Sequence, residues 1–271
     1  MKTMYFINKQ LGFSLVAFSF LIFGVQVSIS AHEPDGRAVG HIVMGDSIEC
    51  GVVLDIGSPI IGDGYVNSFH DGLEFQLGMD MDLVNLCFIG ATSREINLDQ
   101  LPQAVIESIN YDSVVVSMGG GGNNLRRFIT SPQAATCARG NRSCLTRLNA
   151  LLNEAEQNLR LALHTLRSVA GEDSAILIRT QYNALRGTSI LGGACADPAL
   201  IGLADLALEG GVPFLQEGLN DRIRRVAVDH GASIADVFNT FFANPDLIAG
   251  DCIHPTDEGY SVIQDAFIDA F

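Results

Sequence analysis

Five short apolar runs recur along the chain, and their length and spacing constrain its fold more than any other feature. The runs are AVGHIVM (38–44), MDLVNLCFI (81–89), DSVVVSM (112–118), SAILIRT (174–180) and ASIADVF (232–238). Short runs that are almost continuously apolar are typical of strands buried on both faces of a sheet. We therefore expect five buried strands.

Segments with helical periodicity lie between these runs. The clearest are residues 98–109, 144–170, 197–211 and 214–232, and in the last of them the apolar residues share one face before Gly231 supplies a stop signal. Strands that alternate with helices form parallel sheets whose two faces are covered by helices. The sequence therefore predicts an α/β fold with a parallel sheet.

Two segments fit this alternation poorly. Residues 55–80 are rich in Gly and Asp, and residues 137–144 hold a polar stretch between two cysteines. Such compositions favour turns and loops. We expect both segments to be surface excursions that are able to line a site.

Residues 1–30 have the composition of a secretory signal peptide. Lys2 and Lys9 flank a polar start, an apolar stretch follows, and the sequence SIS supplies the small residues that suit a signal peptidase. A retained N-terminal membrane anchor is the alternative. We expect the leader to be removed, leaving one domain over residues 31–271 in a secreted or periplasmic protein.

The predicted mature chain is strongly acidic. The leader holds two of the 16 basic residues and none of the 31 acidic residues, so 14 basic and 31 acidic residues remain and the net charge is −17. This charge disfavours nucleic acid and anionic membranes as partners. We expect a monomer that has neither a nucleic-acid partner nor a stable membrane span.

Six cysteines, an even number, favour disulfides in an exported protein. Six cysteines permit 15 pairings, and sequence alone does not choose among them. Cys137 and Cys144 bracket the polar stretch ARGNRS, so they are the pair that local sequence favours. A zinc site is the alternative, but the chain has no Cys-x-x-Cys pair and no His-rich companion to it, so we expect no metal.

Polar motifs follow the predicted strands, at the points where the strands end. They are GDS (45–47), GATS (90–93), GGGGNN (119–124) and DCIHP (251–255). Ligands bind beyond the carboxyl ends of the strands in open parallel sheets. We therefore expect these four motifs to meet at one edge of the sheet.

Ser47, Asp251 and His254 are the candidates for catalysis. We expect Ser47 to lie where a strand turns into a helix, so it is either a nucleophile or a helix N-cap. The three-residue separation of Asp251 and His254 lets one loop hold a carboxylate against an imidazole, as serine hydrolysis requires. The alternative is that both residues are capping and surface residues.

Asn123 is a candidate donor to an oxyanion, together with the N–H groups of Ser47 and Gly90. The alternative is a plain turn, since Gly and Asn are common turn formers. Residues 119–122 are four consecutive glycines, but the Lys and Ser/Thr of a phosphate-binding loop do not follow them. We therefore expect neither a nucleotide nor another cofactor.

Taken together, the four motifs resemble the sequence blocks of the SGNH (GDSL-type) hydrolase family in order and spacing. The resemblance extends over residues 38–271 and includes the helix LNDRIRRVAVDHGA. It implies a three-layer αβα sandwich with a flavodoxin-like five-stranded sheet in the order 2-1-3-4-5. It also implies an esterase, lipase or deacylase that needs no metal.

The same resemblance implies a role for each site residue. Ser47 would be the nucleophile, His254 the general base and then acid, and Asp251 the group that orients His254. The N–H groups of Ser47 and Gly90 and the amide of Asn123 would form the oxyanion hole. Asn124 departs from the family pattern, which usually has Asp there, and two extra glycines precede the motif, so we expect an altered loop geometry.

The resemblance also gives the remaining cysteines partners. Cys195, in the loop after the fourth strand, would form a disulfide with Cys252 and restrain the catalytic loop. Cys50 would form a disulfide with Cys87. The resemblance implies a substrate that is a small-molecule, lipid or carbohydrate ester, and we expect its selection to depend on residues 55–80 and 125–143. Four apolar residues of the first segment could line an acyl slot, but the favoured alternative is that they serve in packing: Phe69, Leu73, Phe75 and Leu77. A ligand-binding protein that has the same fold and no catalytic activity is the alternative function.

Overall fold

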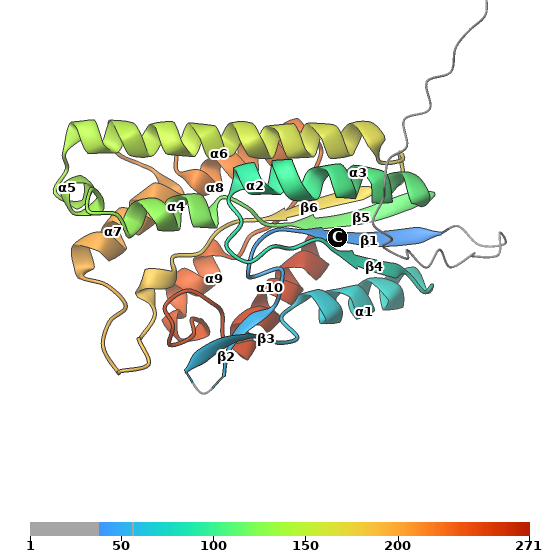
Figure 1. Cartoon of the computed structure of the whole chain (residues 1–271), viewed down its shortest axis with the longest axis horizontal. Coiled ribbons are helices and arrows are strands. Elements are labelled where there is room, and N and C mark those ends of the chain that lie inside the picture. Colours follow the sequence, from blue (N-terminus) through green and yellow to red (C-terminus); the bar gives the residue numbers. More distant parts are fainter. Residues whose placement is uncertain (1–37, 56) are drawn as a thin grey trace, which may run out of the picture. The chain divides into compact units, whose positions relative to one another are not determined.

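A five-stranded parallel sheet forms the centre of the described part of the chain (Figure 1). The structure is a computed structural model that describes residues 38–55 and 57–271, so the predicted leader lies outside the described residues. The strands lie in the order β4 (Asp82–Asn85), β1 (Val39–Met44), β5 (Ser113–Met118), β6 (Ala175–Arg179) and β7 (Ser233–Ala235). Numbered along the chain within this sheet, the order is 2-1-3-4-5, and the predicted fold is confirmed.

The central strands are apolar on both faces because each face of the sheet contributes to a separate core. Successive side chains of a strand point to opposite faces. Val43, Val115 and Leu177 pack in one core cluster. Their neighbours along the same strands pack in the other cluster, which contains Ile42, Met44, Val114, Val116, Ile176 and Ile178. This two-sided burial explains why the sequence runs are continuous rather than alternating.

Helices cover both faces of the sheet (Figure 1). One face carries α3 (Leu101–Asn110), α6 (Arg142–Val169) and α8 (Leu219–Asp229), which pack on the larger core. The opposite face carries α1 (Val66–Leu77) and α10 (Asp257–Ala270). The three layers are therefore helix, sheet and helix, as the resemblance implies.

The long helix α6 begins and ends where its sequence predicts. Asn141 accepts a hydrogen bond from the N–H of Cys144 and caps the N-terminus. Its buried residues recur every three or four positions, and they include Leu145, Leu148, Leu152, Ala155, Leu159, Leu163 and Leu166. This spacing gives one apolar stripe that faces the sheet.

Shorter elements connect these layers. The helical ones are α2 (Ser93–Glu95), a π-helical turn (Ile96–Gln100), α4 (Gly122–Ile129), α5 (Ala134–Ala138), α7 (Pro198–Glu209), α9 (Phe238–Ala243) and two 3-10 turns, Ala184–Arg186 and Pro245–Leu247. The strands β2 (Val52–Asp55) and β3 (Ser58–Ile61) pair as an antiparallel hairpin outside the central sheet. No helix in the described residues is both long enough and apolar enough to cross a membrane.

Residues 55–80 were expected to form a surface excursion, and this expectation is wrong for their second half. Residues 66–77 form α1, in which Phe69 and Leu73 are fully buried in the core beneath the sheet. The Gly and Asp residues conceal this helix because they weaken its periodicity. The hairpin at the start of the segment and one side of α1, which includes Phe75, lie on the surface.

All three expected disulfides are present in the structure. They join Cys50 to Cys87, Cys137 to Cys144 and Cys195 to Cys252. All six cysteines are therefore paired, which leaves no thiolate for a zinc ion. Disulfides of this number are typical of proteins in oxidising compartments.

Candidate active site

Ser47 lies on a tight turn directly after β1. The N–H of Cys50 donates to the carbonyl of Asp46, and the N–H of Val52 donates to the carbonyl of Ser47, so a single turn leads into β2. The expectation that the strand turns into a helix at Ser47 is therefore wrong, and so is the alternative of a helix N-cap. Instead, the Asp46 carboxylate accepts the N–H of Ile48 and closes the turn.

The loop after α9 brings His254 and Asp251 to Ser47. The Nε2 atom of His254 lies 2.9 Å from the Ser47 Oγ atom, and its Nδ1 atom lies 2.5 Å from the Asp251 Oδ2 atom. Both Ser47 and His254 are buried. An Nδ1–H that donates to Asp251 leaves Nε2 able to accept the proton of the Ser47 hydroxyl.

Asp251 is held as a carboxylate. Its Oδ1 atom accepts hydrogen bonds from the N–H groups of Ile253 and His254, each at 3.0 Å. Partial burial acts to raise the pKa of Asp251, but the hydrogen bonds from the side chain and backbone of His254 outweigh it and hold the pKa below its ordinary value. The carboxylate is thus ionised and correctly placed to orient an imidazole.

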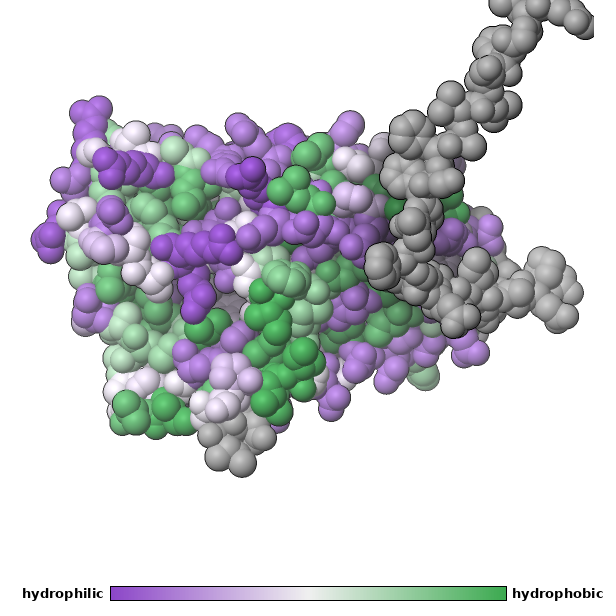
Figure 2. Space-filling view, viewed as in Figure 1, coloured by the Kyte–Doolittle hydropathy of each residue, from purple (hydrophilic) through white to green (hydrophobic). Residues whose placement is uncertain are grey.

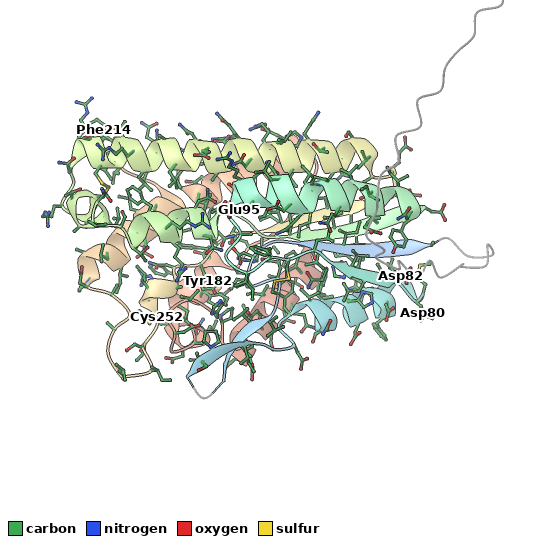
Figure 3. The ribbon with its side chains drawn as sticks, viewed as in Figure 1. Asp80, Asp82, Glu95, Tyr182, Phe214 and Cys252 are labelled. Carbon is green, nitrogen blue, oxygen red and sulfur yellow. A yellow bond between two sulfur atoms is a disulfide. The ribbon has the colours of Figure 1, made fainter. Side chains whose placement is uncertain are left out.

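The Asp251–His254 loop is fixed by contacts on either side of the imidazole. Tyr182, labelled with Cys252 in Figure 3, donates its hydroxyl to the carbonyl of Ile253 at 2.7 Å. The N–H of Ala249 donates to the carbonyl of His254 at 2.8 Å. Cys252 has a φ of 61°, which is unusual for a residue other than glycine, and its disulfide to Cys195 restrains the loop at this point.

The residues of the predicted oxyanion hole, Ser47, Gly90 and Asn123, all line one cavity. Gly90, Asn123 and His254 line this cavity of about 310 Å³, which we call the hairpin cavity because Pro59, Ile60 and Ile61 form its outer wall. Within the described residues, the N–H groups of Ser47 and Gly90 donate to no protein acceptor. The Asn123 amide donates to Asp46 Oδ2 at 3.1 Å and to the carbonyl of Ala91 at 3.2 Å.

Asn124 keeps a hydrogen bond that an aspartate could also make. Its Oδ1 atom accepts the N–H of Ser93 at 2.9 Å, and the residue is buried. Carboxylate and amide oxygens both act as acceptors, so this contact does not require Asp. The glycine run before it passes close to charged groups, since a Cβ atom at Gly119 would collide with Glu49 and Arg179.

A buried charge network lies behind Ser47, and it was not predicted from the sequence. Arg179, at the end of β6, is fully buried and donates from Nε to Glu49 Oε1 at 2.7 Å. The other oxygen of Glu49 accepts the N–H of Asp46 at 2.8 Å. The one available signal was that a charged residue, Arg179, lies within the apolar run 174–180. The network fixes the turn that carries Ser47.

The network also changes the protonation of Asp46. Burial, followed by the nearby Glu49 carboxylate, raises the pKa of Asp46 to about 6, although Arg179 opposes this shift. Burial acts to lower the pKa of Arg179, but the carboxylates of Glu49 and Asp46 prevail and raise it, so Arg179 stays charged. The Asp46 carboxyl therefore binds a proton more readily than an exposed aspartate does.

A second cavity, of about 300 Å³, opens on the other side of Ser47. We call it the helix cavity because α4 and α7 form its walls. Its apolar lining comes from Leu125, Ile129, Leu185, Ala204 and Leu208. Figure 2 shows hydrophobic and hydrophilic residues interspersed over this side of the molecule.

The four apolar residues considered for an acyl slot do not form one, and the packing alternative is correct for two of them. Phe69 and Leu73 are core residues, Phe75 and Leu77 are exposed, and none of the four lines either cavity. Each of the two expected selector segments contributes in part. Residues 125–130 supply part of the helix cavity, and residues 59–61 supply the outer wall of the hairpin cavity.

The sequence matches the GDSL-like lipase/acylhydrolase family over residues 43–262, which is most of the chain. The protein belongs to this family. Membership places it among hydrolases that act on ester bonds, and it confirms the resemblance carried by the four motifs. A search of the curated proteins found no match.

Solved structures share the fold at low sequence identity. A lipase from a goat rumen metagenome is 18% identical, with a TM-score of 0.63 over 86% of this chain and 97% of that one. An acetylxylan esterase from Geobacillus stearothermophilus is 19% identical, with a TM-score of 0.54 over 87% and 94%. A phospholipase A1 from Streptomyces albidoflavus is 17% identical, with a TM-score of 0.55 over 87% and 100%.

Proposed function

We propose that the protein is an exported serine esterase that cleaves carboxylic esters through an acyl-enzyme intermediate. The observation that carries this proposal is the continuous chain of hydrogen bonds from the Ser47 hydroxyl through His254 to the Asp251 carboxylate. This arrangement is the one that activates a serine hydroxyl for attack on a carbonyl carbon. Family membership supports the reaction type.

The first half of the reaction transfers the acyl group to the enzyme. His254 Nε2 accepts the hydroxyl proton as Ser47 Oγ bonds to the carbonyl carbon, and Asp251 stabilises the imidazolium that forms. The tetrahedral intermediate then collapses. The bond to the alcohol oxygen breaks, and His254 donates its proton to that oxygen, so the alcohol leaves and the acyl group stays on Ser47.

The second half repeats these steps with water. His254 accepts a proton from water as the water oxygen attacks the acyl carbon, and it returns that proton to Ser47 Oγ when the acid leaves. The N–H groups of Ser47 and Gly90 are free to stabilise the oxyanion in both halves. Asn123 joins them when one of its N–H bonds turns from Asp46 or Ala91 to the substrate oxygen.

The three disulfides support export, because such bonds persist in secreted and periplasmic proteins. The proposed mature protein is a monomer with one domain over residues 31–271, and its signal peptide is residues 1–30. The proposed chemistry uses only side chains and backbone groups of this chain and requires no metal or cofactor.

Hydrolysis of p-nitrophenyl esters from acetyl to palmitoyl tests the proposal. The assay compares the mature, oxidised protein with its Ser47→Ala variant, and we expect turnover that depends on Ser47. A serine-reactive fluorophosphonate separates an enzyme from a binding protein, since only an activated Ser47 reacts with it. A folded protein that neither turns over an ester nor reacts with the fluorophosphonate would contradict the proposal.

A further inference from the structure

Ser47 lies between two cavities that differ in their lining groups. Ser47 and Asn123 line both cavities, but Gly90 and His254 line only the hairpin cavity. Gly90 and His254, which must both contact the tetrahedral intermediate, therefore lie on the same side of Ser47. This asymmetry orients the substrate.

The orientation follows from the four substituents of the tetrahedral carbon. They are Ser47 Oγ, the oxyanion, the oxygen of the leaving alcohol and the first carbon of the acyl chain. The oxyanion points to the N–H of Gly90, and the alcohol oxygen points to His254, which must protonate it. Both directions lead into the hairpin cavity, so the acyl chain points into the helix cavity.

Away from the exposed Arg126, the helix cavity offers an acyl group mainly apolar contacts, because the polar side chains of Gln181 and Asn183 already have protein partners. The Gln181 amide donates to the carbonyl of Gly120 and accepts from Arg179. The Asn183 amide donates to the carbonyl of Ile201 and to Asp205, and it accepts the N–H of Leu185. A hydroxylated acyl group would leave its own polar atoms unpaired there, at a cost of about 1–3 kcal/mol each.

The size of the cavity limits the length of the chain. Its volume of about 300 Å³ lies at the small end of the range for ligand sites. The apolar walls extend over one helical turn of α4, from Leu125 to Ile129, and one turn of α7, from Ala204 to Leu208. These dimensions suit an aliphatic chain that is longer than acetyl and shorter than palmitoyl.

The opposite cavity is open and apolar at its outer edge. Ile60, Ile61 and Ile89 line it and remain 45, 70 and 52% exposed. An alcohol group that leaves from His254 passes over these side chains into solvent. The alcohol therefore lies against partly exposed apolar side chains.

We propose that the preferred substrate is an ester of an unbranched aliphatic acid of medium length, whose acyl chain fills the helix cavity and whose alcohol lies over the β2–β3 hairpin. This inference rests on the proposed function and adds the substrate class and its direction of binding. It makes Ala204 and Ile61 determinants of specificity for different ends of the ester.

Two variants test this assignment. Ala204→Phe fills the helix cavity, and we expect the ratio of kcat/KM for p-nitrophenyl octanoate to that for the acetate to fall at least tenfold. Ile61→Ser removes apolar contact from the hairpin, and we expect the ratio for octyl acetate to ethyl acetate to fall at least threefold, with the acyl-length ratio unchanged. Ala199→Phe, on the exposed side of α7, is the matched control and changes neither ratio.

The result separates this inference from the proposed function. Turnover that depends on Ser47, with both ratios within twofold of wild type in both variants, overturns the inference alone. So does the reverse pattern, in which Ala204→Phe changes the alcohol ratio and Ile61→Ser the acyl ratio. Absence of Ser47-dependent turnover overturns both. Ala204→Leu serves as a milder second filling variant if thermal unfolding shows that Ala204→Phe does not fold.

Discussion

The turn that carries Ser47 and the loop that carries Asp251 and His254 are held in place by different kinds of interaction. Behind the turn, Glu49 and Arg179 form a buried ion pair without any exposed atom. The loop is fixed by the Cys195–Cys252 disulfide and by hydrogen bonds to its backbone. One half of the site therefore depends on buried charge, and the other half depends on a covalent link. The two halves should fail under different perturbations.

The largest expected effect is on the chemistry of the loop. Asp251→Asn removes the negative charge that stabilises the imidazolium of His254, and we expect kcat to fall by about 10⁴ with little change in thermal stability. The exposed Asp246→Asn in the same region is the control and keeps kcat within twofold of wild type. A loss below tenfold in Asp251→Asn would remove Asp251 from the mechanism.

The second effect is on the stability of the turn. Glu49→Gln removes the closer of the two carboxylates that pair with the buried Arg179 and leaves only Asp46, at 3.8 Å, so we expect the free energy of unfolding to fall by about 3–5 kcal/mol. Glu95→Gln, which breaks an exposed ion pair with Arg127, should cost about 0–1 kcal/mol. Urea unfolding measures both variants. Equal losses in the two would show that the network does not stabilise the turn.

A third perturbation is specific to the loop. Replacement of Cys195 and Cys252 by Ala should lower kcat/KM by about 10²-fold, because small displacements of catalytic groups have effects of this size. Replacement of Cys137 and Cys144 by Ala removes a disulfide that lines neither cavity, and kcat/KM should stay within twofold. The test is to measure kcat/KM for both double variants below their unfolding temperatures and to compare each value with wild type. Similar losses in the two would indicate a general effect on folding.

The smallest effect tests the protonation of Asp46. Its folded pKa is raised from 3.8 to about 6, so the folded state binds the proton more readily than the unfolded state does. Above pH 6, the ionised Asp46 carboxylate lowers the free energy of unfolding. This destabilisation is lost as the pH falls below 6 and the carboxylate binds a proton. From pH 8 to pH 5, the unfolding free energy of wild type should therefore rise by about 1 kcal/mol relative to that of Asp46→Asn. If the difference in unfolding free energy between wild type and Asp46→Asn does not change with pH, the pKa of Asp46 is not raised in the folded protein.

Much of the fold was predictable because β1, β5 and β6 are buried on both faces and so leave continuous apolar runs in the sequence. The disulfides and the places of Ser47, Asp251 and His254 followed from four short motifs. The helix at 66–77 was missed because its Gly and polar residues hide the stripe formed by Phe69 and Leu73. Local sequence also did not distinguish a single turn at Ser47 from the start of a helix.

The features that sequence could not supply are those formed by distant segments. Glu49 and Arg179 are 130 positions apart and meet only because β1 and β6 both end at the same edge of the sheet. The helix cavity likewise requires Leu125 of α4 to face Ala204 of α7. Apolar residues in one segment also do not reveal which surface they cover, so sequence alone left open an acyl slot or packing for four residues: Phe69, Leu73, Phe75 and Leu77.

The central claim is that Ser47 forms an acyl-enzyme, and its most direct test is to trap that species. The oxidised protein is mixed with p-nitrophenyl octanoate, quenched in acid during turnover, digested and analysed by mass spectrometry. We predict an octanoyl group on the peptide that contains Ser47, and no such group in the Ser47→Ala variant. Turnover of the ester with an acyl group on another residue, or with none on Ser47 at any quench time, would contradict the account.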